Sequence, residues 1–144
     1  MAGKVVIGSD HGGFSLKEFA VKLLTDMGYD VVDAGPEAAV SCDYPVYAEK
    51  VAKQVIEEKV LGILICGTGL GMSMAANKHK GIRAAMCTNE YMARMARAHN
   101  NANILCLGER VIGPGLAEEI IRAFMTSEFE GDRHLRRINL FDPQ

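Results

Sequence analysis

Residues 61–71 read LGILICGTGLG, an apolar run of strand length that ends in Cys66 and is followed at once by a glycine-rich turn. The run 61–66 carries no polar side chain before Cys66, so both faces of this strand are expected to be buried. The turn leads into 72–79, a stretch we expect to form a short helix. A buried strand, a tight turn and a helix in this order are typical of a parallel sheet covered on both sides.

The same alternation of strand and helix occurs five times along the chain. The expected strands are 4–8, 29–33, 61–66, 82–87 and 103–107, and the expected helices are 14–27, 45–58, 72–79, 88–99 and 114–124. Ser15 and Glu18 have the spacing of a capping box for the first helix. Right-handed crossovers then predict a doubly wound α/β sandwich with a parallel sheet between two helical layers.

We expect one domain over residues 1–144, because the chain shows no linker, internal repeat or low-complexity stretch. Only the polar and basic tail, from about 130 to 144, breaks the alternation, and it is expected to reach over a neighbouring surface.

Composition excludes several classes of function. The formal net charge is −2 with no basic block, so nucleic-acid binding is not indicated. No apolar run approaches the roughly 18–20 residues needed to cross a bilayer, and the N-terminus lacks a signal-peptide pattern, so we expect a cytoplasmic protein with no membrane partner. The cysteines lack zinc-finger or C-x-x-C spacing, and we expect free thiols, with Cys87 and Cys106 filling the core.

Polar and glycine-rich residues follow the strands where a parallel sheet binds its ligands, beyond the carboxyl ends. The loop 67–71 lacks the glycine spacing of a dinucleotide fingerprint and the lysine of a Walker A loop. What remains is a run of backbone N–H groups at the start of a helix, which suits an anion. Either a phosphate or the oxyanion of an enolate satisfies this pattern.

Cys66 and His99 are the candidate chemical groups. A thiol at the positive end of a helix favours the thiolate form, and a catalytic role requires the Cys66 sulfur to face the glycine loop rather than the hydrophobic interior. The alternative for Cys66 is a small buried residue that completes the strand. His99 is expected to point inward at a helix tip, where packing or capping is the alternative role. Arg133 and Arg137 lie four residues apart in the tail and align if the tail is helical. The alternative is a solvated basic face to which Arg136 and His134 contribute.

Several segments of this chain resemble the type B ribose-5-phosphate isomerases and their relatives over nearly its whole length. The matching segments are IGSDHGG (7–13), DYP (43–45), CGTGLGMSMAANK (66–78), GIRAA (81–85), HNNANIL (99–105), GER (108–110) and the tail GDRH…R (131–137). The block at 66–78 is the most specific of them. The resemblance implies a Rossmann-like three-layer α/β/α sandwich and a homodimer or homotetramer with active sites shared between subunits, the tail packing on a partner.

The resemblance also implies a role for each matching residue. Cys66 corresponds to the base; some relatives carry serine there and use a glutamate downstream, but that position is Met72 here. His99 corresponds to the acid and base that opens the sugar ring, and Thr68 belongs to the loop around the reacting carbon. The substrate-binding residues implied are Asp10, His11, Tyr44, Gly67, Gly69, Leu70, Gly71, Asn100, Arg110, Arg133 and Arg137. Many relatives have a second glycine where this chain has Asp132, a carboxylate that either weakens phosphate binding or points outward.

The reaction implied is interconversion of ribose 5-phosphate and ribulose 5-phosphate through a cis-enediolate. This reaction is redox-neutral, so no cofactor is expected, and the sequence offers no convincing metal cage. A six-carbon substrate such as allose or galactose 6-phosphate is the nearest alternative. A non-catalytic phosphosugar-binding module and a receiver-like signalling domain are more distant ones, and the receiver is disfavoured because Cys66 stands where an aspartate is needed.

Overall fold

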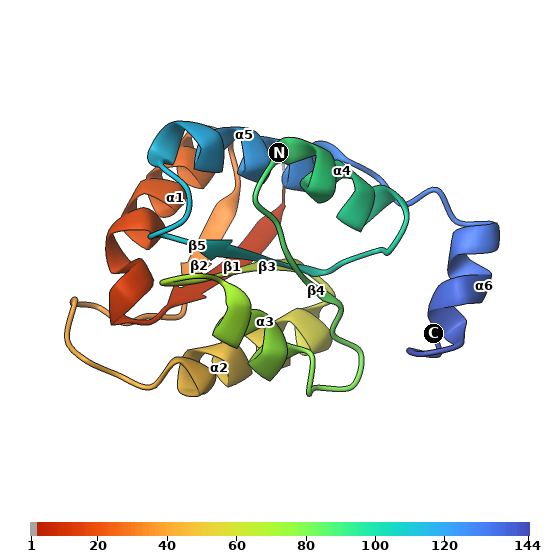
Figure 1. The fold of residues 1–144 in the computed structure, drawn as a ribbon, viewed down its shortest axis with the longest axis horizontal. Coiled ribbons are helices and arrows are strands. Elements are labelled where there is room, and N and C mark those ends of the chain that lie inside the picture. The colour runs from red at the N-terminus through yellow and green to blue at the C-terminus, as the bar shows by residue number, and fades with distance from the viewer. Residues whose placement is uncertain (1–2) are drawn as a thin grey trace.

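The computed structural model describes residues 3–144, which form a single parallel sheet between two layers of helices (Figure 1). The five strands pair in the order β2-β1-β3-β5-β4, with every neighbouring pair parallel. Their bounds are β1 Lys4–Ser9, β2 Asp30–Asp33, β3 Leu61–Cys66, β4 Ala84–Met86 and β5 Ile104–Gly108. The predicted sandwich with its five-stranded parallel sheet is confirmed.

Helices α1, α4 and α5 cover one face of the sheet, and α2 and α3 cover the other (Figure 1). Their bounds are α1 Phe14–Asp26, α2 Tyr44–Glu58, α3 Leu70–Ala76, α4 Glu90–Ala98 and α5 Pro114–Thr126. A short 3-10 helix, η1 His11–Gly13, precedes α1. Across residues 3–144, every helix is too short or too polar to cross a membrane.

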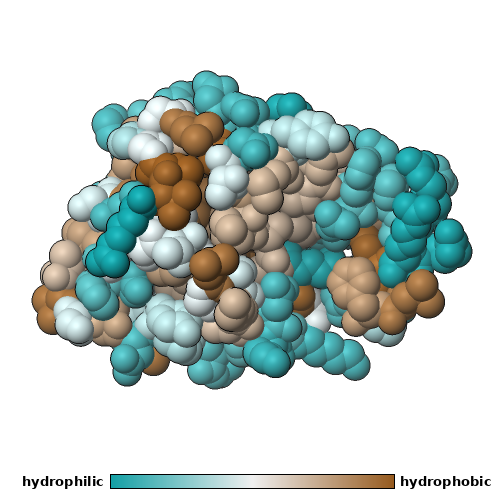
Figure 2. All heavy atoms as spheres, in the orientation of Figure 1, coloured by the Kyte–Doolittle hydropathy of each residue, from teal (hydrophilic) through white to brown (hydrophobic). Residues whose placement is uncertain are grey.

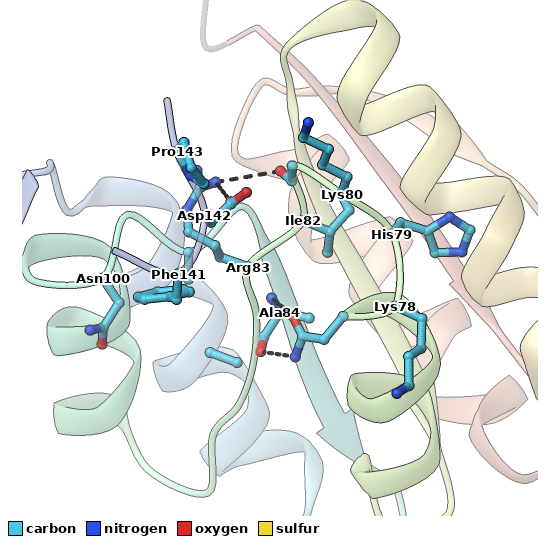
Figure 3. A pocket seen from close by; sticks show the side chains of 14 residues that line it. Lys78, His79, Lys80, Ile82, Arg83, Ala84, Asn100, Phe141, Asp142 and Pro143 are labelled. Atoms are coloured by element: carbon cyan, nitrogen blue, oxygen red, sulfur yellow. Dashed lines mark hydrogen bonds and ion pairs between the residues drawn. The ribbon is translucent and has the colours of Figure 1, made fainter. Parts of the chain in front are cut away.

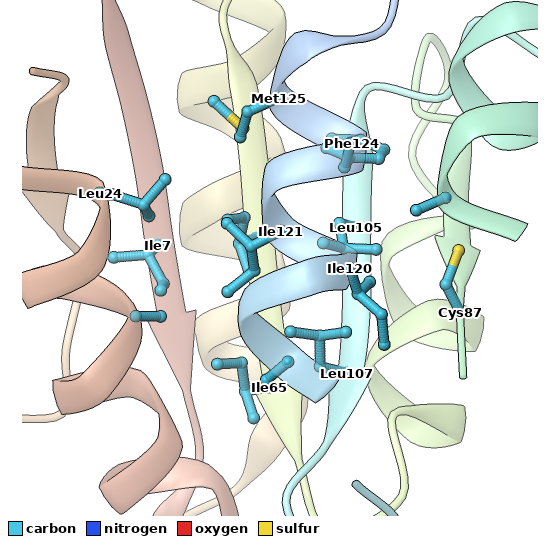
Figure 4. Packing of buried hydrophobic residues seen from close by; sticks show 14 of the residues in the cluster. Ile7, Leu24, Ile65, Cys87, Leu105, Leu107, Ile120, Ile121, Phe124 and Met125 are labelled. Carbon is cyan, nitrogen blue, oxygen red and sulfur yellow. The ribbon is translucent and has the colours of Figure 1, made fainter. Parts of the chain in front are cut away.

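Alternating side chains of the central strands divide between two apolar cores. Ile63 and Ile65 of β3 pack under α1, α4 and α5 with Phe124 and other residues of α5 (Figure 4). Leu64 and Cys66 point to the opposite face, where they pack with α2 and α3. This alternation is the two-residue period of a strand, and it places the Cys66 side chain on the α2–α3 side of the sheet.

The start of α1 differs from the prediction. Gly13 is the N-cap residue, and no side chain of the helix caps it, so the predicted capping box of Ser15 and Glu18 is wrong. The N–H of Leu16 instead donates to Glu109 Oε1 over 2.7 Å. A carboxylate from the loop after β5 therefore satisfies the first turn of α1 and ties it to the carboxyl edge of the sheet.

The tail forms a separate helix, α6 Arg133–Asn139, which projects from the end of the sandwich (Figure 1). Two contacts anchor the segment around it. The imidazole of His134 stacks on His99, with ring centroids 4.2 Å apart. Beyond the helix, Arg83 Nη1 donates to Asp142 Oδ2 over 2.6 Å in an ion pair whose side chains are both 11% exposed.

Candidate functional site

Backbone hydrogen bonds hold the loops after β1, β3 and β5 together at the carboxyl edge of the sheet. The N–H of Asp10 donates to Ile65 O, and the N–H of Glu109 donates to Cys66 O. One residue further on, the N–H of Arg110 donates to Gly67 O over 3.0 Å. The residues predicted to follow these strands therefore surround Cys66, as the topology requires.

The sulfur of Cys66 meets the glycine loop, although the side chain is only 6% exposed. The N–H of Gly69 donates to Cys66 Sγ over 3.1 Å. The same side chain belongs to the apolar core under α2 and α3. The predicted contact between sulfur and loop is thus present, and the thiol has a backbone donor that stabilises a negative charge on it.

Two amides of the loop already have acceptors within the chain. The N–H of Gly69 faces the Cys66 sulfur, and the N–H of Leu70 donates to Thr68 Oγ1 over 3.2 Å. Fewer N–H groups of residues 67–71 are therefore free to bind an anion than the sequence suggests. Because the Thr68 oxygen accepts a hydrogen bond here, its own proton is available to an oxygen of a bound molecule.

Other predicted binding residues line the same edge. Asp10 Oδ1 accepts from the N–H of Gly13 over 3.1 Å, which fixes the carboxylate beside the loop. A Cβ placed on Gly67 would lie 3.6 Å from Arg110 Nη1, so the guanidinium passes directly over the loop. On the other side, the ring of Tyr44 lies against Gly71, where a Cβ would come within 2.8 Å of Cε1.

His11 has a neighbour that the sequence analysis did not connect with it. The N–H of Cys42 donates to His11 Nδ1 over 3.3 Å, and Cys42 Sγ lies 4.0 Å from the same nitrogen. Cys42 directly precedes the segment DYP (43–45), which is the only sequence signal that could have placed it at the site.

The remaining predicted residues lie in a second cluster, at the end of α4 and in the tail. His99 is the C-cap residue of α4, and its ring stacks on His134 with an angle of 10° between the planes. Arg133 and Arg137 flank His134 on α6. His134 is buried, so the alternative of a solvated basic face does not hold for this residue. Its pKa lies below the ordinary value because of desolvation and, secondarily, the nearby charge of Arg133.

The two clusters lie at opposite edges of the sheet. Gly62 at the start of β3 pairs with Ile104, and Cys66 at its end pairs with Gly108. His99 precedes Ile104 by five residues, and α4 must return antiparallel to the strands because β4 and β5 are parallel. The length of β3 between Gly62 and Cys66, about 13 Å, separates the two edges. Within one chain, His99 and the tail arginines are not brought to Cys66.

Asn100 lines a cavity of about 690 Å³ that also lies away from Cys66. Its wall is formed by the segment 77–85 and by Phe141 and Asp142 of the tail (Figure 3). The side chains of Lys78 and Lys80 extend in different directions there, so their charges do not converge on one point (Figure 3). A second cavity, of about 630 Å³, is not lined by Cys66 either.

All four cysteines are free thiols, as predicted. Burial raises the pKa of Cys87 to about 11, and it raises that of Cys106 as well, with a further contribution from the neighbouring thiols Cys66 and Cys87. Both residues are buried in the core, which confirms the prediction that they are packing residues. Cys66 is the buried cysteine whose sulfur accepts a backbone N–H.

The family model described as Ribose/Galactose Isomerase matches residues 5–141. This chain belongs to that family. Ribose-5-phosphate isomerase B of Escherichia coli strain K12 is 46% identical over 136 residues, which are 94% of this chain and 91% of the relative. The family resemblance stated from the sequence segments is therefore confirmed, and with it the assignment of this protein as an isomerase.

Solved structures of the Ribose/Galactose Isomerase family have the same fold. Ribose-5-phosphate isomerase B of Clostridium thermocellum superposes with a TM-score of 0.94 at 53% identity, covering 95% of this chain and 93% of that chain. A ribose 5-phosphate isomerase of Thermotoga maritima gives a TM-score of 0.95 at 49% identity, covering 98% of each. The match extends over the tail as well as the sandwich.

Proposed function

We propose that this chain interconverts D-ribose 5-phosphate and D-ribulose 5-phosphate, with Cys66 as the base. The observation that carries the proposal is the hydrogen bond from Gly69 N–H to Cys66 Sγ, 3.1 Å long, at the carboxyl edge of the sheet. Relatives close in sequence and in structure are named ribose-5-phosphate isomerase B. The thiol, the glycine loop and the surrounding polar side chains supply what a proton transfer between two sugar carbons needs.

In the proposed step, the Cys66 thiolate removes the proton from C2 of the open-chain aldose. The electrons of the broken C–H bond form the C1=C2 double bond of a cis-enediolate, and the negative charge moves to O1. After a proton passes from O2 to O1, the Cys66 thiol returns its proton to C1 and the C2 carbonyl forms. The Thr68 hydroxyl is a donor for the enediolate oxygen; losing one such donor typically costs about 3–4 kcal/mol of barrier.

We propose that His99, Arg133 and Arg137 act on the site of a second copy of the chain. His99 opens the furanose ring as acid and base, Arg133 and Arg137 bind the phosphate, and Asn100 contacts the substrate. Their position at the edge of the sheet opposite Cys66 supports this arrangement. Asp10, His11, Tyr44 and Arg110 complete the Cys66 half of the site, beside the loop residues Gly67, Gly69, Leu70 and Gly71.

The surface supports an assembly of two or more copies. Figure 2 shows apolar atoms on the face of the sandwich that carries α3 and α4. The exposed apolar residues of these two helices are Leu70, Met74, Tyr91 and Met92. The tail adds Leu140 and Phe141, which are 80% and 67% exposed. Burying such residues against a second copy is favourable, and we propose a homodimer or homotetramer, without a cofactor, in the cytoplasm.

Substitution of Cys66 by alanine tests the proposed base. We expect Cys66→Ala to lower kcat for ribose 5-phosphate by about 10²–10⁴-fold, because the group that accepts the C2 proton is lost. Calorimetry should still show ribose 5-phosphate binding, since the phosphate ligands remain. Cys87→Ala is the matched control and should keep turnover. Substantial turnover in Cys66→Ala would contradict the mechanism.

Substrate size is tested with the parent protein. Ribose 5-phosphate, allose 6-phosphate and galactose 6-phosphate are compared by kcat/KM. The presence of Cys66, His99 and both tail arginines in one chain favours the pentose phosphate. A higher kcat/KM for either hexose phosphate would show that the hexose phosphate is the preferred substrate.

A further inference from the structure

Three side chains with metal-binding atoms come together where α4, the 127–132 segment and α6 meet. They are His99, Glu130 and His134, and one ligand atom of each lies within 4.8 Å of the other two. The N–H of Glu130 donates to Ala98 O, which fixes the acidic residue beside the end of α4. No spacing motif in the chain points to this cluster, because 31 positions separate His99 from Glu130.

The distances from the carboxylate to the two imidazoles are close to those around a tetrahedral ion, and the two imidazole ligand atoms lie within 4.8 Å of each other. Glu130 Oε1 lies 3.8 Å from His99 Nε2 and 3.5 Å from His134 Nε2. Zinc bound to nitrogen and oxygen at about 2.0–2.2 Å holds its ligand atoms roughly 3.3–3.5 Å apart. Both distances are longer than a good hydrogen bond and close to that value. Two imidazoles with one carboxylate are also a ligand set that zinc uses in proteins, leaving a fourth position open.

An unpartnered nitrogen of His134 is independent support for a bound ion. His134 is 5% exposed, and its Nε2 has no hydrogen-bond partner within residues 3–144. A buried polar atom without a partner costs free energy unless something binds it. This Nε2 lies 3.5 Å from the carboxylate and on the ring that stacks on His99, so it is aimed into the cluster.

Two features oppose a tight site. The rings of His99 and His134 are nearly parallel, so their lone pairs converge only after one ring rotates about its Cβ–Cγ bond. Arg133 and Arg137 carry positive charge close to His134, which disfavours a second cation. Both features argue against a permanent structural ion and for one that is bound weakly and reversibly.

We propose that His99, Glu130 and His134 bind a zinc ion that inhibits the enzyme. A metal on His99 Nε2 occupies the lone pair that this nitrogen needs to transfer a proton, so ring opening stops while the ion is bound. The binding site stands on the geometry alone, whereas the inhibition rests on the proposed function of His99.

Binding is measured first, in a Cys66→Ala background that removes the competing thiol. Calorimetry with ZnCl₂ and visible absorption with Co²⁺ should show one saturable site per chain, with the absorption bands of four-coordinate cobalt. The matched variant is His134→Phe in the same background, which keeps a ring stacked on His99 but has no nitrogen ligand. We expect it to fold, because it replaces an unpartnered buried nitrogen by carbon, and to lose the saturable signal. An unchanged zinc isotherm in His134→Phe, or no binding to the parent, would overturn the site.

Inhibition is then measured with Cys66 present. Zinc should inhibit the enzyme and a chelator should restore its activity. The His134→Phe variant should need at least about tenfold more zinc for the same fractional loss, each protein being compared with its own metal-free rate. Equal zinc sensitivity would place the inhibitory ion on Cys66 instead and overturn the regulatory claim. If neither protein isomerises ribose 5-phosphate, the proposed function fails, while the calorimetric result for the zinc site still stands.

Discussion

Gly69 supplies the amide that faces the Cys66 sulfur, and its backbone leaves no room for a side chain. Its φ is +84°, in a region that residues other than glycine rarely adopt. A Cβ on Gly69 would lie 2.9 Å from Met86 Cγ and 3.1 Å from the carbonyl carbon of Leu107. The loop can therefore present this N–H to the sulfur only while residue 69 is glycine.

We expect Gly69→Ala to lower kcat by at least about tenfold, because the amide must shift away from Cys66 Sγ. The positive φ should also cost about 1–2 kcal/mol of unfolding free energy. Gly28→Ala is the control: Gly28 has φ +95°, but a Cβ added there would meet nothing within 4 Å, and it lies far from the site. It should show a similar backbone cost in urea denaturation with unchanged turnover. Equal losses of activity in both variants would contradict the role of the Gly69 amide.

Cys87 makes stability depend on pH. Burial raises the pKa of the folded thiol from 9.0 to about 11. Between pH 9 and 11 the unfolded chain releases this proton while the folded chain keeps it, so the free energy of unfolding must fall as pH rises.

We expect Cys87→Ala to lose less stability than the parent between about pH 8 and pH 10.5. Lysines and tyrosines titrate in the same range, so the measured quantity is the difference between the two proteins in reducing urea titrations. Parallel stability curves would show that the Cys87 thiol ionises equally well in both states.

At the scale of elements, strand and helix order could be predicted from the sequence, because buried parallel strands are continuous apolar runs. The ends of helices and strands were predicted less accurately where side-chain hydrogen bonds determine them. The side chain of Asn77 accepts from Ala84 N–H and donates to Ala84 O. Strand β4 begins at this residue, two residues later than predicted. The cap of α1 was missed because Leu16 and Glu109 are 93 positions apart.

The candidate site likewise has a part that could be predicted from the sequence and a part that could not. Cys66 and its loop could be predicted, since both lie in one continuous segment whose position at the strand end follows from topology. The burial of His134 could not, because it results from the packing of α6 on the end of α4, and the local sequence of the tail is polar and basic.

The ion pair between Arg83 and Asp142 anchors the tail that carries the two arginines. Arg83 also donates from Nε to Asn101 O over 2.9 Å, so the guanidinium is held on the sandwich side. If Arg133 and Arg137 bind the phosphate of a neighbouring site, their positions depend on this anchor.

We expect Asp142→Asn to cost about 1–3 kcal/mol of unfolding free energy, because a partly buried charged hydrogen bond is weakened. KM for ribose 5-phosphate should rise about fivefold, equivalent to about 1 kcal/mol of binding, with a smaller change in kcat. Asp26→Asn is the control, since Asp26 pairs with Lys22 on an exposed helix surface, where such pairs contribute little. A KM unchanged in Asp142→Asn would mean that the tail is positioned by other contacts.

At the scale of the whole molecule, one chain holds the two groups of proposed site residues at opposite ends of its strands. Cys66 and the glycine loop lie at the carboxyl edge of the sheet, and His99 lies at the edge where the strands begin. A two-fold assembly would bring the His99 edge of each copy to the Cys66 edge of the other and create two identical sites.

This arrangement predicts that two inactive variants restore each other. In a mixed dimer of Cys66→Ala and His99→Asn, one site combines the intact Cys66 of one chain with the intact His99 of the other, and the second site carries both substitutions. Random reassociation, checked by co-purification of a tag on one chain, should recover about a quarter of the parent activity. His99→Asn mixed with Arg137→Ala is the control: both substitutions fall on the same half-site, so neither site of the mixed dimer is complete and activity should not exceed the average of the two variants measured separately. If tagged mixed dimers of Cys66→Ala and His99→Asn form and remain inactive, Cys66 and His99 do not work across the interface.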